Sequence, residues 1–159
     1  MNDNRYLLDA NVVSRLTPEQ RASPFVSTHC RIPADVMHEV GEISDRSSIA
    51  HLGLPVNAST LGRLREVMAT VTPGDVSLVD LYRFKGTADP VLIAAALAAD
   101  HGEGRLWPTE WHVVSDDNAV RVTASLLGVP WLSRAGLVEL IDGGREDEVA
   151  ESSGSSENT

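Results

Sequence analysis

The sequence predicts an α/β fold, a three-layer α/β/α sandwich around a mostly parallel central sheet. Short apolar segments with the character of strands alternate with segments of helical periodicity, an order typical of parallel sheets covered by helices. The 159 residues are enough for one domain with a substantial core. Aromatic residues make up only 4% of the chain, so we expect a core built largely from Leu, Val, Ile and Ala.

In the first half, the pattern predicts two strands among helices. In chain order, we expect a strand over 6–9, a helical start at 10–16 that Pro18 interrupts, an extended segment over 25–32, a helix over 34–43 with Pro33 in its first turn, a connection over 44–57, and an amphipathic helix over 59–71.

The second half repeats the alternation. It predicts a helix over 76–84, where Val and Ser leave a strand as the alternative, an apolar helix over 88–100, a strand over 112–115, a helix over 116–128, a strand over 129–132 and a last helix over 134–141. Residues 142–159 carry six acids against one arginine and end in "ESSGSSENT". We therefore expect two regions, a folded domain over 1–141 and an acidic disordered tail over 142–159.

Bulk composition excludes several classes of protein. A formal net charge of −10 argues against a protein that holds nucleic acid through overall positive charge. The longest near-apolar run, 90–99, is too short to cross a bilayer, so we expect no membrane association. One cysteine and no signal-peptide pattern at the start predict a cytoplasmic protein without disulfides.

Acids follow two of the predicted strands. Asp9 ends the first strand, and Asp116 and Asp117 follow "HVVS", beside Ser115. Ligands of parallel sheets bind outside the carboxyl ends of the strands, so these acids would face such a site. Each is also a good N-cap for the next helix, but one cap does not need two adjacent acids. Capping and function remain open for Asp9, and function is favoured for the Asp116–Asp117 pair.

Two further acids occupy informative positions. Asp89 precedes Pro90, and this pair is typical of a helix start, so local evidence favours capping. Glu39 fills the i+3 place of an apolar stripe whose other members are Val36, Val40 and Ile43. A carboxylate there is costly to desolvate, which favours a functional role.

Four carboxylates at one end of a sheet would repel each other, and their pKa values would rise unless a cation neutralised them. Hard oxygen ligands select Mg²⁺ or Mn²⁺, and these ions hold phosphates and activate water. The residues therefore indicate a metal-dependent site that acts on a phosphate ester.

Four segments in order resemble the PIN-domain ribonucleases of the VapC toxin type. They are "LLDANVV" at 7–13, "IPADVMHEV" at 32–40, "GTADPVLIAAAL" at 86–97 and "HVVSDDNAVRVTASLLGVPWL" at 112–132. The similarity spans roughly residues 5 to 140. It implies an α/β/α sandwich that cleaves RNA with Mg²⁺ or Mn²⁺, forms a homodimer and is silenced by a small antitoxin protein.

The resemblance also assigns residue roles. It implies that Asp9, Glu39, Asp89 and Asp117 are the catalytic acids and that Asp9, Asp89 and Asp117 bind the metal. Supporting roles fall to Asn11, to Ser115, where the family more often has Thr, and to Asp116 at a variable position. The RNA contacts we expect are basic residues near the site: Arg15, Arg83, Lys85 and Arg121.

Two other functions compete with this hypothesis. A PIN-like module could bind RNA or a protein without cleaving, although such a module has no reason to keep four repelling carboxylates together. A phosphoryl-transfer domain of the haloacid-dehalogenase type is disfavoured, because "DANVV" lacks a second Asp two residues after Asp9. Residues 44–73 match no motif, so the sequence does not indicate their role.

Overall fold

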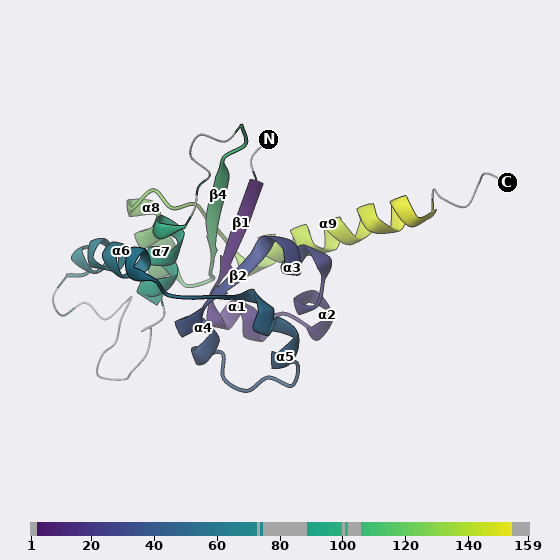
Figure 1. Cartoon of the computed structure of the whole chain (residues 1–159), viewed down its shortest axis with the longest axis horizontal. Helices are drawn as coiled ribbons and strands as arrows, with labels where there is room; N and C mark the ends of the chain where they lie inside the picture. The colour runs from purple at the N-terminus through teal and green to yellow at the C-terminus, as the bar shows by residue number, and fades with distance from the viewer. Residues whose placement is uncertain (1–2, 73, 75–88, 100, 102–105, 154–159) are drawn as a thin grey trace.

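The computed structural model describes residues 3–72, 74, 89–99, 101 and 106–153 (Figure 1). The side chains of Asp89 and of 145–153 are not part of this description. The helix predicted over 76–84, together with Arg83 and Lys85, lies outside the described residues.

The strands form one parallel sheet, which confirms the predicted α/β class. Five strands in the order β3-β2-β1-β4-β5 pair in parallel throughout. They are β1 (Asp3–Leu8), β2 (Cys30–Pro33), β3 (Gly53–Leu54), β4 (Thr109–Val114) and β5 (Trp131–Leu132). Because β1 is central, the residue that follows it enters the middle of the sheet's carboxyl edge.

Helices separate the strands along the chain. Their bounds are α1 (Ala10–Arg15), α2 (Pro18–Arg21), α3 (Pro24–His29), α4 (Ala34–Glu39), α5 (Arg46–Ile49), a 3₁₀ turn η1 (Ala50–Leu52), α6 (Ala58–Ala69), α7 (Asp89–Ala98), α8 (Asn118–Leu126) and α9 (Arg134–Ser153). In the described residues no helix is both long and apolar enough to cross a membrane.

Helices cover both faces of the sheet, as the sandwich prediction requires. In Figure 1, α6 and α7 lie on one side of β1 and β4, and α3 and α9 lie on the other. The apolar helix α7 packs directly on β1, β2 and β4, and its Leu92 and Ile93 are fully buried. On the opposite side α9 contributes Leu137 and Ile141, which are also fully buried. The core is aliphatic, as the composition predicts.

The second predicted strand was placed wrongly at its start. Residues 24–29 are helical, and only Cys30–Pro33 are extended. Ser23 accepts a hydrogen bond from the Val26 amide, and Pro24 occupies the first turn, so a cap and an N1 proline begin this helix. The β-favouring residues "FVSTH" concealed this signal.

The helix over 34–43 is shorter than predicted. It ends at Glu39, and Gly41 adopts a left-handed backbone with φ of 71°. Glycine takes that conformation without the steric cost of a Cβ atom, so the helix stops there. Ile43 consequently lies beyond the helix and is not part of a continuous helical stripe.

Two other segments differ from their predictions. The expected connection over 44–57 contains α5, η1 and the edge strand β3. The last helix continues past Ile141 to Ser153, where the sequence predicted a disordered tail from 142 onward, and residues 154–159 lie outside the description. Ile141 is buried, and the next two residues, Asp142 and Gly143, are exposed.

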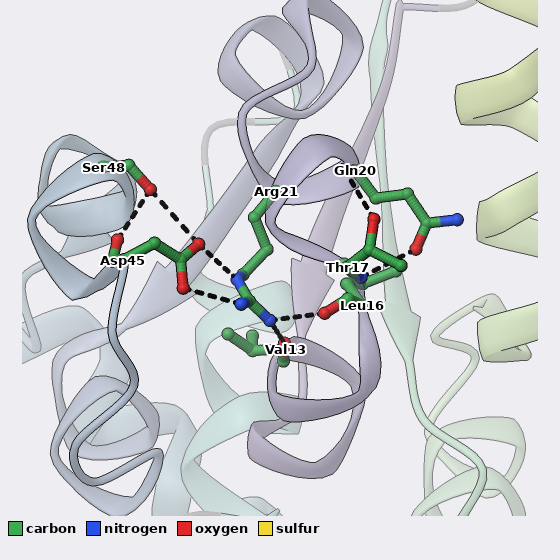
Figure 2. Close-up of polar contacts among 7 residues, drawn as sticks. All are labelled: Val13, Leu16, Thr17, Gln20, Arg21, Asp45 and Ser48. Atoms are coloured by element: carbon green, nitrogen blue, oxygen red, sulfur yellow. Dashed lines mark hydrogen bonds and ion pairs between the residues drawn. The ribbon is translucent and has the colours of Figure 1, made fainter.

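A buried arginine fixes α1 beside the sheet. The Arg21 guanidinium donates to the carbonyls of Val13 and Leu16 at the end of α1 and makes two bonds, of 2.7 and 2.6 Å, to the Asp45 carboxylate (Figure 2). Only 6% of the Arg21 side chain is exposed. These bonds join α1, α2 and the loop before α5, and so hold the helix that begins directly after Asp9.

Candidate active site at the carboxyl edge of the sheet

Asp9 lies between β1 and α1 and is almost completely buried. Its backbone is extended and its amide donates to the Val114 carbonyl at 3.1 Å, which continues the pairing of β1 with β4. Its side chain makes no capping hydrogen bond to α1, although it stands at the N-cap position. Instead Asp9 Oδ2 accepts from Ser115 Oγ at 2.7 Å. This side-chain hydrogen bond therefore crosses the sheet, and the amides of Ala10 and Asn11 at the start of α1 also act on the Asp9 carboxylate.

Ser115 connects two predicted site acids. It is fully buried at the end of β4, where its amide donates to the Leu132 carbonyl of β5. Its hydroxyl donates to Asp9 and accepts from the Asp117 amide at 3.0 Å. The residue predicted as a supporting one thus forms the hydrogen-bonded link between Asp9 and the segment of Asp117.

Asp117 and Asp116 each form hydrogen bonds to the start of a different helix. Asp117 Oδ1 accepts from the amides of Ala119 and Val120 and caps α8. Asp116 Oδ1 accepts from the Arg134 amide at 2.9 Å, at the start of α9. Asp117 alone caps α8, so the cap does not use both adjacent acids, and Asp116 is hydrogen-bonded to the start of α9 instead. Asp117 is exposed and commits only Oδ1 to its cap.

Glu39 reaches the same edge from α4. In Figure 1, α1 and α4 lie side by side where β1 and β2 end. Glu39 is the last residue of α4 and is exposed at its surface, so it does not sit within the buried stripe that the sequence indicated. Its position is nevertheless close enough for the charge of Asp9 to act on it.

Three of the four predicted catalytic acids, Asp9, Asp117 and Glu39, interact through their charges. Burial raises the pKa of Asp9, and the charge of Asp117 raises it further, against a lowering by Ser115 and by the amides of Asn11 and Ala10. Burial also raises the pKa of Glu39, with an added contribution from Asp9. No cationic side chain is among these influences in the described part of the chain. The site favours a bound positive charge.

The donor set fits a hard divalent cation, but the described residues do not complete a site. Carboxylate oxygens suit Mg²⁺ or Mn²⁺. Within the described ranges, however, no three acids, histidines or cysteines are grouped so as to hold a metal ion. The third predicted ligand, Asp89, begins α7, and its side chain is outside the description. Asp9 and Asp117 are therefore the two predicted ligands whose side chains are both described.

The structure describes some of the predicted supporting and RNA-binding residues, and they differ in exposure and contacts. Asn11 is exposed, and the contact assigned to it here is through its backbone amide, which lowers the pKa of Asp9. Arg15 is exposed one turn after Asn11 on α1. Arg121 donates from Nη2 to the Asp116 carbonyl at 2.9 Å and stacks over Trp131. Arg83 and Lys85 lie outside the described residues.

Sequence reasoning missed Trp131 and Arg134. Arg134 contacts Asp116 through its amide, and its Nε lies 3.7 Å from Asp116 Oδ2. Trp131 lies beside α8 because β5 pairs with β4, so its contact with Arg121 depends on sheet register. Spacing along the chain carries no signal for either contact.

The comparisons with known proteins assign no family. No protein-family model matches this chain, and no curated protein matches it. Support for a function comes instead from the geometry of the acids and from the four motifs.

Proposed function

We propose that this protein is a metal-dependent endoribonuclease of the PIN type. The observation that carries the proposal is the carboxylate of Asp9, which is hydrogen-bonded to Ser115 and whose pKa is raised by burial and further by Asp117. A buried carboxylate without a described cationic neighbour is unfavourable unless a ligand supplies positive charge. The four motifs supply the rest of the argument.

Each acid has a distinct place in the proposed site. Asp9, Asp117 and Asp89 would hold Mg²⁺ or Mn²⁺, and Glu39 would lie beside them at the end of α4. The bound ion would supply Lewis acidity toward the phosphate and a more acidic water. Ser115 fixes the orientation of the Asp9 carboxylate by donating to Oδ2. The Asp9 and Ala10 backbone, tied to β4 and α1, keeps that carboxylate in place without substrate.

Cleavage of RNA with a matched set of variants tests the proposal. We expect the protein to cleave single-stranded or structured RNA with Mn²⁺ or Mg²⁺ and to lose this activity in EDTA. Asp9→Asn should lower kcat by at least about 100-fold, because it removes a charge needed only with the metal. Glu42→Gln removes the charge of an exposed acid beyond the end of α4 and serves as the control.

Asp117→Asn separates chemistry from folding. Asparagine caps helices as well as aspartate, so this variant should keep α8 and the thermal transition while cleavage falls. Asp117→Ala should lower both, because it also removes the cap on Ala119 and Val120. Full cleavage by Asp9→Asn and by Asp117→Asn would refute the metal mechanism.

A second candidate is a PIN-like module that binds RNA or a protein without cleavage. It is favoured by the engagement of Asp116 and Asp117 in helix contacts and by the absence of a ready-made metal group in the described residues. Titration calorimetry with Mn²⁺ separates the two functions. The nuclease should bind the ion with an affinity that Asp9→Asn abolishes, whereas the module should bind none.

The proposed biological role is that of a toxin in a toxin–antitoxin pair, acting as a cytoplasmic homodimer with a small antitoxin protein as its partner. This role follows from the resemblance. Expression of the intact chain should arrest growth, and Asp9→Asn should relieve the arrest. Growth arrest that persists with this variant would argue against RNA cleavage as its cause.

A further inference from the structure

A groove of about 380 Å³ runs along the outer face of α8. It is lined by Asn118, Arg121, Val122, Ser125, Leu126 and Trp131. The first five lie at the spacing of one helical face, so they cover about 12 Å of helix length. Trp131 forms the opposite wall from the edge strand β5.

The walls of the groove are apolar and uncovered. Val122 is 51% exposed, Leu126 is 72% exposed and Trp131 is 41% exposed. Single exposed apolar residues are ordinary, but three around one hollow mark a binding surface. The volume lies within the range of about 300–1,000 Å³ that is typical of sites for small ligand groups.

A cation and an aromatic ring are held together in the groove. The Arg121 guanidinium carbon lies 5.0 Å from the centroid of the Trp131 ring. Trp131 Nε1 donates to Ser125 Oγ at 3.1 Å, which fixes the indole. Within the described residues the Arg121 side chain makes one hydrogen bond, from Nη2 to the Asp116 carbonyl; its Nε is buried, so the donors that remain for a ligand are those of the Nη atoms.

The groove begins one residue after a candidate site acid. Asn118 at its end directly follows Asp117, and Arg121 bonds to the backbone of Asp116. A strand of RNA bound at the carboxylates could therefore continue along α8 without leaving the surface. The Arg121 guanidinium contacts both the backbone of Asp116 and the Trp131 wall, so it offers a cation to a backbone phosphate of such a strand.

We propose that this groove binds an unpaired nucleobase of single-stranded RNA, adjacent to the cleaved bond, with Arg121 on a neighbouring phosphate. The proposal rests on the nuclease function above and adds the class of substrate. Unpaired bases stack on aromatic rings and guanidinium planes, and phosphates bind arginine. A protein partner would need roughly 800 Å² of surface, and the groove offers a hollow of ligand size beside the acids instead.

Binding of labelled RNA tests the groove separately from cleavage. Fluorescence anisotropy in EDTA would follow fluorescein-labelled, mixed-sequence single-stranded decamers on the intact chain. We expect Trp131→Leu to weaken binding about tenfold, as the loss of base stacking does, and Trp131→Phe to retain most of it. The control is Trp107→Leu, which removes a 55% exposed ring just before β4, at the opposite end of the sheet.

Kinetics with Mn²⁺ provide a second measurement. Trp131→Leu should raise KM about tenfold and change kcat by less than about twofold, because it removes binding and not chemistry. Double-stranded RNA of the same sequence should bind the parent more weakly than single strands and should not distinguish Trp131→Leu from the parent.

The outcomes separate the two proposals. If RNA binds through Trp131 but is never cleaved, the proposed nuclease function is overturned and the proposed base-binding groove stands. If Trp131→Leu cleaves and binds RNA as the parent does, the proposed base-binding groove is overturned and the proposed nuclease function stands. The groove would also be overturned if the parent binds no single-stranded RNA. The same holds if Trp131→Leu abolishes self-association in sedimentation while RNA affinity is retained, which would make the surface a protein interface.

Discussion

Asp9 occupies a position that disfavours its own charge. Its side chain is 4% exposed, and its pKa is raised mainly by burial and further by Asp117. The folded state therefore binds a proton more readily than the unfolded chain does. The consequence for stability has a defined sign: the carboxyl favours folding below its ordinary pKa, and this contribution is lost as pH rises through the raised folded value.

We expect Asp9→Asn to be more stable than the parent at about pH 7. The amide can still accept from Ser115, and the buried charge is gone. The gain should be on the order of 1 kcal/mol, or a rise in Tm of about 2–4 °C. Thermal denaturation followed by circular dichroism, without added metal, measures it.

The gain should shrink as the pH is lowered toward the ordinary pKa of Asp9, where the parent also carries a neutral group. Glu42→Gln, at an exposed loop position, should show no comparable pH-dependent gain. A less stable Asp9→Asn variant at neutral pH would mean that the native carboxylate is stabilised by its surroundings, contrary to the raised pKa.

For single residues, the sequence predicted which side chains lie at the site better than it predicted the contacts that they make. Asp9 and Asp117 were predicted from their place at the ends of strands and Ser115 from the resemblance, and the structure bonds Ser115 to both segments. The apolar stripe around Glu39 was expected to run too far, because Gly41 ends the helix early; the Glu39 side chain is exposed, although partial desolvation still raises its pKa. Contacts such as Arg121 with Trp131 require the pairing of β4 with β5, which periodicity does not give.

The segment from α1 to α5 is held together by one arginine. Arg21 contacts two carbonyls at the end of α1 and both oxygens of Asp45 (Figure 2). The hydrogen bond from Arg21 lowers the pKa of Asp45. This carboxylate therefore stabilises the fold above its ordinary pKa, and the contribution is lost as pH falls through the lowered folded value. Its pH dependence is opposite in sign to that of Asp9.

Arg21→Gln should destabilise the protein by about 2–4 kcal/mol, because the carbonyls of Val13 and Leu16 and the Asp45 carboxylate all lose donors. Urea denaturation measures the loss. The acid-induced decrease in stability should also be smaller in this variant than in the parent.

Arg63→Gln is the matched control. Arg63 pairs with Glu66 on α6, where both side chains are about half exposed, at 47% and 50%. Such exposed pairs contribute about 0–1 kcal/mol. Equal losses from the two arginine variants would show that Arg21 does not hold these elements together.

The sequence predicted helices and strands correctly where the hydrophobic pattern is long. It missed short helices whose start depends on a capping residue. The apolar helix at α7 and the strands β1 and β4 were found because their patterns are continuous. The short helices α2 and α3 follow the caps Thr17 and Ser23 and each start with proline; in α3 the β-favouring residues after Pro24 obscured the cap, and α2 is only four residues long. The strand β3 has only two residues, too few for any alternation to be seen.

The net charge of −10 applies to the whole molecule and limits how it can hold RNA. Phosphate contacts must be local, and the described candidates are Arg15 and Arg121. Base stacking in the groove on α8 would supply affinity that does not depend on charge. Salt also screens the long-range repulsion between an acidic protein and RNA. This effect opposes the weakening of RNA binding that added salt usually causes.

We therefore expect a shallow salt dependence of RNA binding. With two phosphate contacts, the slope of log K against log salt should be about −1.4, and additional contacts from Arg83 and Lys85 would bring it to about −2.8. Anisotropy titrations between about 50 and 200 mM salt measure it. Arg121→Gln should make the slope shallower by about 0.7, and Arg63→Gln, on α6, should leave it unchanged. A slope steeper than about −5 would require an extended basic surface.

The short outer strands have a consequence for how copies of this chain could associate. In the described sheet, β3 and β5 form the two edges, and each has only two residues. Adding a strand from another molecule needs a longer row of free amides and carbonyls than either edge presents. A dimer of this chain should therefore be joined through helix side chains, and mutations on helices, rather than proline insertions in β3 or β5, should dissociate it.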